Sequence, residues 1–156
     1  NYIMTLDATD KKILQLLQED SKQTTKALSL KLNLSVTAIY ERIKKLEREG
    51  IITDYVALVD PELLNAKLTV FCQVSLVQHT EDIVKAFETD ILKFPEVVSC
   101  FHVSGDNDYL IKVLVPNMKA FRQFMVKKLT SLKYLGSTKS SFVMNTVKDS
   151  TAIPIT

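Results

Sequence analysis

The chain has 156 residues, of which 46% are hydrophobic and 24% charged, the balance of an ordinary globular protein. No apolar run approaches the roughly 20 residues that cross a bilayer, and no signal-peptide pattern opens the sequence, so we expect a cytoplasmic protein without a membrane partner. The sequence from Met4 onward, MTLDATDKK, has the form of a natural N-terminus, and we expect Asn1 to Ile3 to take no part in function. Cys72 and Cys100 lack a CxxC spacing and lie in apolar runs, which predicts reduced core thiols.

The net charge of +2 belongs entirely to the first third of the chain. Residues 1–52 hold nine Lys and Arg against seven Asp and Glu, whereas residues 53–156 hold eleven of each. Affinity for a polyanion such as a nucleic acid grows with the number of phosphates neutralised, so one copy with an excess of two charges should bind any polyanion poorly. Pairing copies makes the second contact intramolecular and raises affinity about 10²- to 10⁴-fold. The charge distribution therefore predicts an oligomer.

Residues 5–52 predict three helices in the order of a helix-turn-helix. Asp7 is placed to cap a first helix whose apolar residues repeat at helical intervals. Residues 25–32 form a second, shorter amphipathic helix, and Asn33-Leu34 makes the tight bend that follows it. The first helix completes the unit, the second crosses the DNA backbone, and the third enters the groove.

The third helix has the best-marked boundaries and the clearest two faces. Ser35 is a favourable N-cap, and Gly50 supplies the left-handed residue that ends helices. Three of the five residues on its outward face are basic, and short Thr37 and Ala38 stand where base edges are read. A helical hairpin that only builds a core is the alternative, and neighbouring glutamates can neutralise part of the charge. We assign DNA contact to Ser35, Thr37, Ala38, Glu41, Arg42, Lys44, Lys45 and Arg48.

The second part of the chain alternates strands and helices. Residues 53–63 are β-branched and end near Pro61, which predicts a hinge strand and linker before a domain over residues 64–156. Helices are expected after Thr80 and Asn117, and strands over residues 67–77, 97–104, 109–115 and 137–147. The order β-α-β-β-α-β is the ferredoxin-like arrangement, with two helices on one face of an antiparallel sheet. The expected fold class is α+β.

The other face of this sheet carries more apolar side chains than is usual for a surface exposed to water. Phe71 and Val77 point there from the first strand, with Leu110 and Leu114 from the third. Exposed apolar sheet faces usually mark a partner surface, and self-association is the economical answer. A symmetric dimer would deliver two recognition helices to successive major grooves about 34 Å apart.

Four segments resemble the leucine-responsive regulatory protein family, also called the Lrp/AsnC or feast/famine regulators. They are LDATDKKILQLLQED, LSVTAIYERIKKLEREGIITDY, GDNDYLIKV and STKSSFVMNTVK, and the resemblance runs from Thr5 onward. It implies a DNA-binding domain, a hinge strand and a C-terminal ligand-sensing domain that forms dimers and often octamers. It also implies amino-acid effectors. Lys22 stands where many members have arginine, and Asn65-Ala66 replaces a glycine common after the hinge, which could alter the interdomain geometry.

The loop Gly105 to Asp108, GDND, is the candidate effector site. An amino acid needs acceptors for its ammonium and donors for its carboxylate, and a tight turn with free backbone N–H groups beside two aspartates offers both. We take Asp108 as the first choice for the ammonium and Asp106 as the second. The alternative is a hairpin turn built from good turn formers. The resemblance favours sensing and implies a wider effector set: Gly105, Asp106, Asn107, Asp108, Met118, Ser140, Ser141 and Phe142.

Other chemistries lack support in the sequence. His79 and His102 share no metal-ligand spacing with the cysteines, and the GDND loop fails the EF-hand pattern. No nucleotide-binding or nucleophile motif occurs, so we expect neither a cofactor nor an enzyme. An amino-acid-responsive transcription factor is the main hypothesis. An architectural DNA-wrapping protein without an effector is the alternative, with a ferredoxin-like enzyme third.

Overall fold

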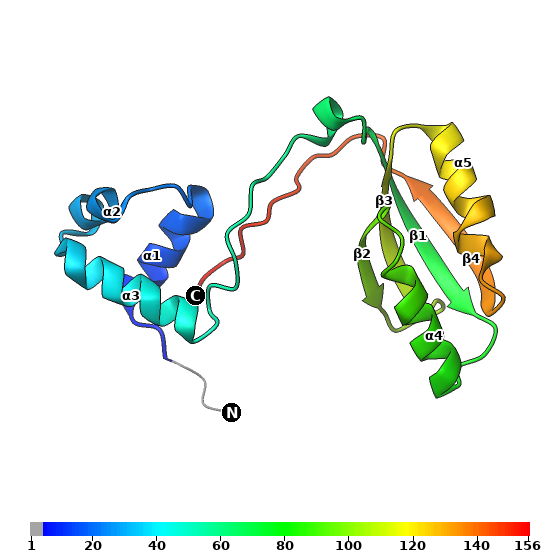
Figure 1. The fold of residues 1–156 in the computed structure, drawn as a ribbon, viewed down its shortest axis with the longest axis horizontal. Helices are drawn as coiled ribbons and strands as arrows, with labels where there is room; N and C mark the ends of the chain where they lie inside the picture. The colour runs from blue at the N-terminus through cyan, green and yellow to red at the C-terminus, as the bar shows by residue number, and fades with distance from the viewer. Residues whose placement is uncertain (1–4) are drawn as a thin grey trace. The chain divides into compact units, whose positions relative to one another are not determined.

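The computed structural model describes residues 5–156, so the expectation for Asn1 to Ile3 lies outside the described residues. The chain divides into two compact units (Figure 1). The first unit takes the chain up to Leu58 together with Lys148–Thr156, and the second takes Val59–Val147. A three-helix unit followed by a β-α-β-β-α-β sheet confirms the expected α+β class.

The first unit is built from α1 (Ala8–Glu19), α2 (Thr25–Leu32) and α3 (Val36–Arg48). Side chains cap each start: Asp7 forms a capping box with Asp10, and the Thr24 and Ser35 side chains accept main-chain N–H bonds in the next turn. Asn33 adopts the left-handed conformation, φ 53°, that turns α2 into α3. The small core consists of Ile13, Leu14, Leu28, Ile39 and Leu46.

The C-terminal segment Lys148–Thr156 groups with the first unit, whereas the sequence placed it with the domain over residues 64–156. The Gln18 side chain makes two hydrogen bonds with the main chain of Ile153: its Nε2 donates to the carbonyl at 3.0 Å, and the Ile153 N–H donates to Oε1 at 2.8 Å. Ile155 packs against the core of the first unit. These partners lie 135 positions apart, so no local pattern could have revealed them.

The second unit is a four-stranded antiparallel sheet in the order β2-β3-β1-β4. Helices α4 and α5 cover one face of it (Figure 1). The elements are η1 (Pro61–Leu64), β1 (Leu68–Leu76), α4 (Glu81–Ile91), β2 (Val97–His102), β3 (Tyr109–Val115), α5 (Met118–Lys127), η2 (Leu129–Ser131) and β4 (Leu135–Phe142). The last strand begins and ends earlier than the expected range 137–147.

Alternation along the strands separates a packed face from an open one. In β1, Val70, Cys72 and Val74 are fully buried under the helices, while Phe71 between them is 36% exposed. The core also takes apolar side chains from β3, α4, α5 and η2: Tyr109, Ile111, Val113, Val115, Phe87, Ile91, Phe121, Phe124 and Leu129. The face toward water is therefore the one that carries Phe71 and Leu110, as its pattern predicted.

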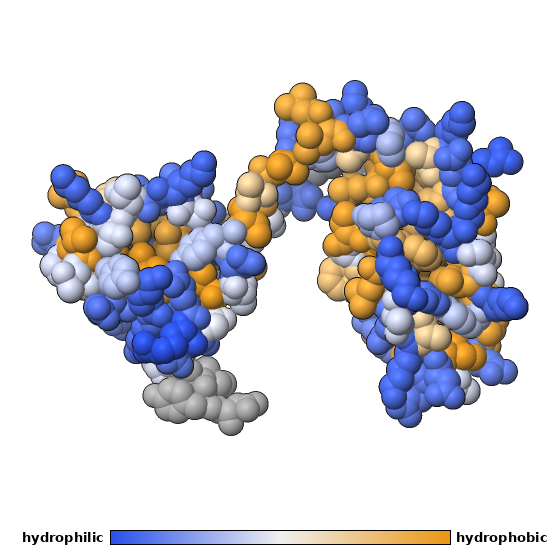
Figure 2. All heavy atoms as spheres, in the orientation of Figure 1, coloured by the Kyte–Doolittle hydropathy of each residue, from blue (hydrophilic) through white to orange (hydrophobic). Residues whose placement is uncertain are grey.

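Apolar side chains are also exposed along the segment between α3 and β1 (Figure 2). They are Val56, Leu58, Val59, Leu63 and Leu64, each at least 60% exposed. Isolated exposed apolar residues are ordinary, whereas five within residues 56–64 are a concentration typical of a surface that contacts a partner. Within residues 5–156, no helix is long and apolar enough to cross a membrane.

Candidate DNA interface and ligand site

The outward face of α3 is exposed along its whole length, as expected for a helix packed on one side. Ile39 and Leu46 are fully buried, while the side chains of Lys44 and Arg48 are 49% and 70% exposed. Thr37, Glu41 and Lys45 share the exposed face, and Ala38 is half-buried. Ser35 has a local structural role, because its Oγ accepts the Ala38 N–H at 3.1 Å.

The Arg42 guanidinium forms ion pairs with two aspartates of the first unit and is not available on the outer face of α3. Its Nη1 donates to Asp7 Oδ2 at 2.7 Å and to Asp10 Oδ1 at 2.8 Å, and Asp10 is 5% exposed. These bonds raise the pKa of Arg42, with Asp7 as the larger cause. The pKa of Asp7 is lowered, first by the Asp10 N–H and then by Arg42. Arg42 therefore ties α3 to the start of α1, which was not evident from its position in the basic stretch.

Lys44 is held within its own helix. Its Nζ donates to Glu47 Oε2 at 2.8 Å and lies 5.6 Å from the centre of the Tyr40 ring. Glu47 Oε1 also accepts the hydroxyl of Tyr55 at 3.0 Å. The bond with Glu47 raises the pKa of Lys44, while burial and then Glu47 raise the pKa of Tyr55 to about 12.

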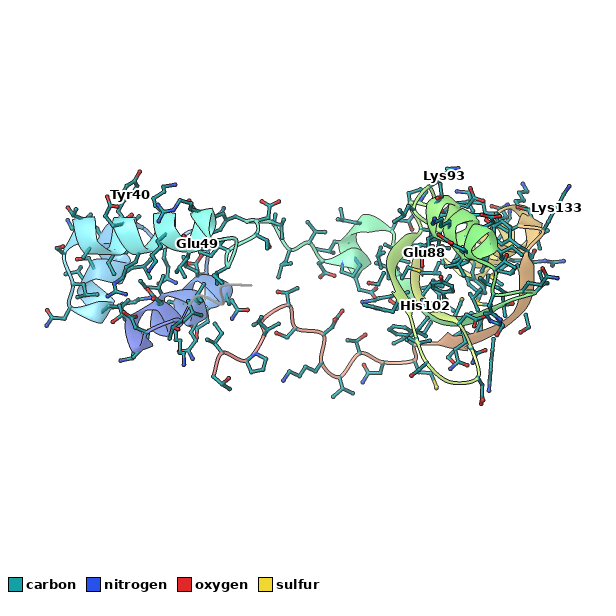
Figure 3. All side chains as sticks on the ribbon, turned by 90° about the horizontal axis from the view of Figure 1, so that it is seen from below. Tyr40, Glu49, Glu88, Lys93, His102 and Lys133 are labelled. Carbon is teal, nitrogen blue, oxygen red and sulfur yellow. The ribbon has the colours of Figure 1, made fainter. Side chains whose placement is uncertain are left out.

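Lys45 and Arg48 carry the remaining positive charge of α3. Among residues 5–156, Lys45 has no hydrogen-bond or ion-pair partner, and Arg48 has only a distant contact, its Nε 3.7 Å from Glu49 Oε1. The sequence could not separate these two from Arg42 and Lys44. It also missed Tyr40, which Figure 3 shows pointing away from the bundle on the outer side of α3.

Asp108 is the structural anchor of the loop between β2 and β3. Its Oδ2 accepts the Leu76 N–H at 2.7 Å, and its Oδ1 lies 2.7 Å from His79 Nε2. Its own N–H donates to the Val74 carbonyl at 2.9 Å. The Leu76 bond is the largest cause that lowers the pKa of Asp108. Gly105, at φ +118°, supplies a backbone conformation that other residues rarely adopt.

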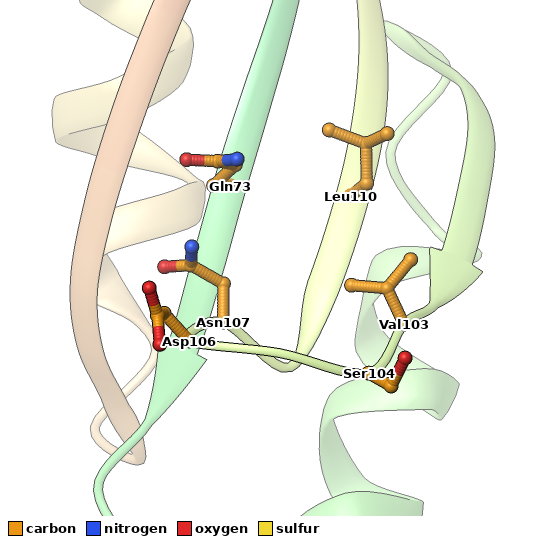
Figure 4. A pocket seen from close by; sticks show the side chains of 6 residues that line it. All are labelled: Gln73, Val103, Ser104, Asp106, Asn107 and Leu110. Carbon is orange, nitrogen blue, oxygen red and sulfur yellow. The ribbon is translucent and has the colours of Figure 1, made fainter.

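Beside this loop the open face of the sheet has a hollow of about 300 Å³ (Figure 4). It combines apolar and polar groups from β1, β3 and the loop: Gln73, Val103, Ser104, Asp106, Asn107 and Leu110. The Asn107 Oδ1 accepts a bond from Ser75 Oγ at 3.1 Å. Asp106 has no partner among residues 5–156. The hollow therefore presents one free carboxylate beside apolar side chains.

Of the other expected effector residues, Ser140, Phe142 and Met118 lie away from this hollow in the same chain, whereas Ser141 shares its open face. Phe142 pairs with Val70, four rungs along β1 from the Val74–Tyr109 pair beside the loop. At about 3.3 Å per rung this is roughly 13 Å. Phe142 and Ser140 face the helix side, where Ser140 Oγ meets Cys72 Sγ and the Phe142 ring contacts Phe121. Ser141 pairs with Phe71 of the open face, and Met118, 55% exposed, begins α5.

Residues that could hold a metal or react as thiols form no further site. Among residues 5–156, no three His, Cys, Asp or Glu side chains gather as metal ligands. Cys72 is buried and Cys100 half-buried, both as free thiols, and burial raises the pKa of each.

Both units match known families. Residues 6–53 match the winged helix-turn-helix DNA-binding family, and residues 69–153 match the Lrp/AsnC ligand binding domain. The chain is 39% identical to the leucine-responsive regulatory protein of Escherichia coli (strain K12) over 150 residues, covering 96% of this chain and 92% of that one.

Solved structures agree with these matches over nearly the whole chain. A transcriptional regulator from Neisseria meningitidis in complex with L-Met is similar with a TM-score of 0.93 at 39% identity, covering 96% of this chain and 97% of that one. An AsnC family regulator from Agrobacterium tumefaciens has a TM-score of 0.91 at 38% identity, with the same coverage. E. coli AsnC, at 22% identity and a TM-score of 0.89, shares the fold over 97% of this chain and 100% of its own.

Proposed function

The chain belongs to the Lrp/AsnC family of transcriptional regulators, and on this basis we propose that α3 reads operator DNA while the second unit senses a free amino acid. Membership makes it a DNA-binding regulator with a ligand-binding domain, and not an enzyme. The finer assignments concern which side chains contact DNA, which contact the effector, and how copies assemble.

In the proposed DNA complex, the start of α3 faces the bases and its end faces the backbone. Thr37 and Ala38 are short and lie in the first turn, where recognition helices contact base edges. Lys45 and Arg48 contact phosphates, because their charges are not held by close partners. Lys44 contributes less, since Glu47 already takes its ammonium. Arg42 keeps a structural role.

The proposed effector site is the hollow at the loop, and Asp106 takes the ammonium group there. The observation that carries this choice is that both Asp108 oxygens already have partners, while the Asp106 carboxylate faces the hollow without one. Backbone donors around Gly105 take the carboxylate, and Val103 and Leu110 contact the ligand's side chain. The related regulator with L-Met bound supports an amino acid as the class of ligand.

We propose a homodimer formed through the open sheet face, with dimers assembling further into an octamer. Phe71 and Phe101 are 36% and 56% exposed, and the segment between α3 and β1 adds exposed apolar surface. Phe142 lies four rungs from the loop on the helix side of the sheet, and Met118 follows Val115 at the end of β3 away from the loop. A single amino acid in the hollow is too short to reach either residue, so they contact it only from another copy. We place this assembly in the cytoplasm, with access to DNA.

A melting screen against the standard amino acids tests the sensing role. At about 100 times its Kd, a true effector adds roughly 2.7 kcal/mol of stability, which raises the melting temperature of a unit this size by several degrees. We expect the rise for one or a few L-amino acids, with no rise for the D-forms. Asp106→Asn should reduce the rise by about half or more, because a Kd raised at least about tenfold leaves the ligand at no more than about ten times Kd. The matched change Asp82→Asn, at an exposed carboxylate of α4, should preserve the rise. The architectural DNA-wrapping function would replace ours if no amino acid moved the melting temperature.

A further inference from the structure

Tyr40 is an exposed aromatic residue on the outer face of the helix that we place in the DNA groove. Its side chain is 51% exposed and points away from the bundle (Figure 3). Val36, one turn earlier on the same face, is 47% exposed. The first half of α3 thus presents apolar surface, and the second half presents Lys45 and Arg48. This division suits base contacts at the start of the helix and phosphate contacts at its end.

The Tyr40 ring lies at the end of a chain of contacts that favours one position of its side chain. Lys44 Nζ stands 5.6 Å from the ring centre, a cation–π distance. Glu47 fixes that ammonium at 2.8 Å, and Tyr55 in turn donates to Glu47 at 3.0 Å. A ring ordered before binding loses less conformational entropy when DNA arrives. The arrangement therefore prepares Tyr40 to contact a partner outside the chain.

We propose that Tyr40 is a base-reading residue that contacts the C5 methyl group of a thymine in the major groove, with Lys44 as its positioning residue. This rests on the proposed function of α3. Thymine alone among the four bases carries an apolar group in that groove, and apolar side chains recognise it by contact. Burial of one methyl group is worth about 0.8 kcal/mol, or roughly a fourfold change in Kd.

Replacing thymine by deoxyuridine removes that methyl group and leaves base pairing unchanged, which gives a direct test. A duplex selected from a random pool by the full-length protein is remade with one thymine at a time replaced by deoxyuridine. We expect wild type to lose about fourfold in affinity at one position of each half-site. Tyr40→Ala should bind the two duplexes equally, whereas Tyr40→Phe, which keeps the ring, should still distinguish them.

Lys44→Met separates positioning from contact. It keeps most of the apolar length of the side chain and removes the charge over the ring, so discrimination between thymine and deoxyuridine should fall without being abolished. Circular dichroism melting of each variant checks that the helices are intact. The proposal is overturned if wild type is indifferent to every replacement, if Tyr40→Ala retains the fourfold difference, or if Tyr40→Phe loses it.

A second variant distinguishes failure of this inference from failure of the proposed function. Lys45→Ala combined with Arg48→Ala should weaken binding to every duplex and lower its salt dependence. If that double variant bound DNA like wild type, α3 would not be the recognition helix at all. If it lost affinity while Tyr40→Ala kept the methyl preference, only the role of Tyr40 would be wrong.

Discussion

The outer face of α3 and the loop between β2 and β3 distribute their charges in the same way. On α3, Arg42 is bound by Asp7 and Asp10, while Lys45 remains free. In the loop, both Asp108 oxygens are taken, while Asp106 faces the hollow. In each region one charged residue, Arg42 or Asp108, has a structural role because its charge is paired within the chain. A nearby residue of the same charge, Lys45 or Asp106, has no partner within the described residues and is available to bind a ligand.

The difference between the two regions is in what the scaffold residue supports. Arg42 joins two helices of a unit whose described core has only five buried side chains. Asp108 fixes a turn on a sheet that has a much larger core. Loss of the scaffold residue should therefore harm the first unit more than the second, and loss of the free neighbour should harm neither fold.

Arg42→Ala should have the largest effect on stability. It leaves the Asp10 carboxylate, 5% exposed, without its counter-charge, and we expect the first unit to lose about 2–4 kcal/mol. For a unit of this size that lowers the melting temperature by more than about 8 °C. Lys45→Ala is the matched control, since it should melt like wild type. Equal melting temperatures for Arg42→Ala and its control would show that the ion pairs of Arg42 do not stabilise the first unit.

Asp108→Ala should come next, with a loss of about 1–3 kcal/mol from the second unit, because the Leu76 N–H loses its acceptor. Asp106→Ala, two residues away, should leave the free energy of unfolding without ligand unchanged. Urea unfolding followed by tyrosine fluorescence measures both. The comparison between scaffold and free carboxylate fails if Asp106→Ala is the more destabilised of the two.

Lys45→Ala should lower the slope of log affinity against log salt by about 1, as for one lost phosphate contact. Lys44→Ala should lower it by less, because the Lys44 ammonium is already neutralised by Glu47 at 2.8 Å. Fluorescence anisotropy with a labelled duplex between low and moderate salt gives both slopes. A larger change for Lys44 would mean that its bond with Glu47 opens when DNA binds.

The pH dependence of the second unit should show the smallest effect. Because the pKa of Asp108 is lowered in the folded state, its contribution to stability is present above its ordinary value of 3.8. That contribution is lost as the pH falls below this value through the folded-state pKa. Wild type should therefore lose stability toward pH 3, and Asp108→Asn should lose less over the same range. Parallel acid-unfolding curves for the two proteins would contradict this.

Local periodicity explains what could be predicted from the sequence. The apolar stripe of α3 and the alternation of β1 are repeats within a few residues, so the buried positions Ile39, Leu46 and Val70 follow directly. The turn types around Gly105 are equally local. These patterns were enough to predict the helices of the first unit and the strand order of the second, while the sensing role of the Gly105 loop rested on the family resemblance and the C-terminal segment was placed with the wrong unit.

Pairings across the chain could not be predicted, because no repeat records them. Arg42 meets Asp10 over 32 positions, and Leu76 meets Asp108 over the same separation. Residue type indicated that these charges matter, but only the fold shows which of them are already used. From the sequence we therefore predicted Asp108 before Asp106 as the residue that binds the ligand's ammonium group. The hydrogen bonds of Asp108 favour the reverse order.

Calorimetric titration of the stabilising amino acid into wild type, Asp106→Asn and Asp82→Asn tests the central claim most directly, with L-Met as the first probe. Asp106→Asn removes one charged hydrogen bond to the ammonium, so we expect its Kd to rise at least about tenfold. Its melting temperature without ligand should equal that of wild type, and Asp82→Asn should bind like wild type. An unchanged Kd in Asp106→Asn would contradict the assignment of this carboxylate to the ligand.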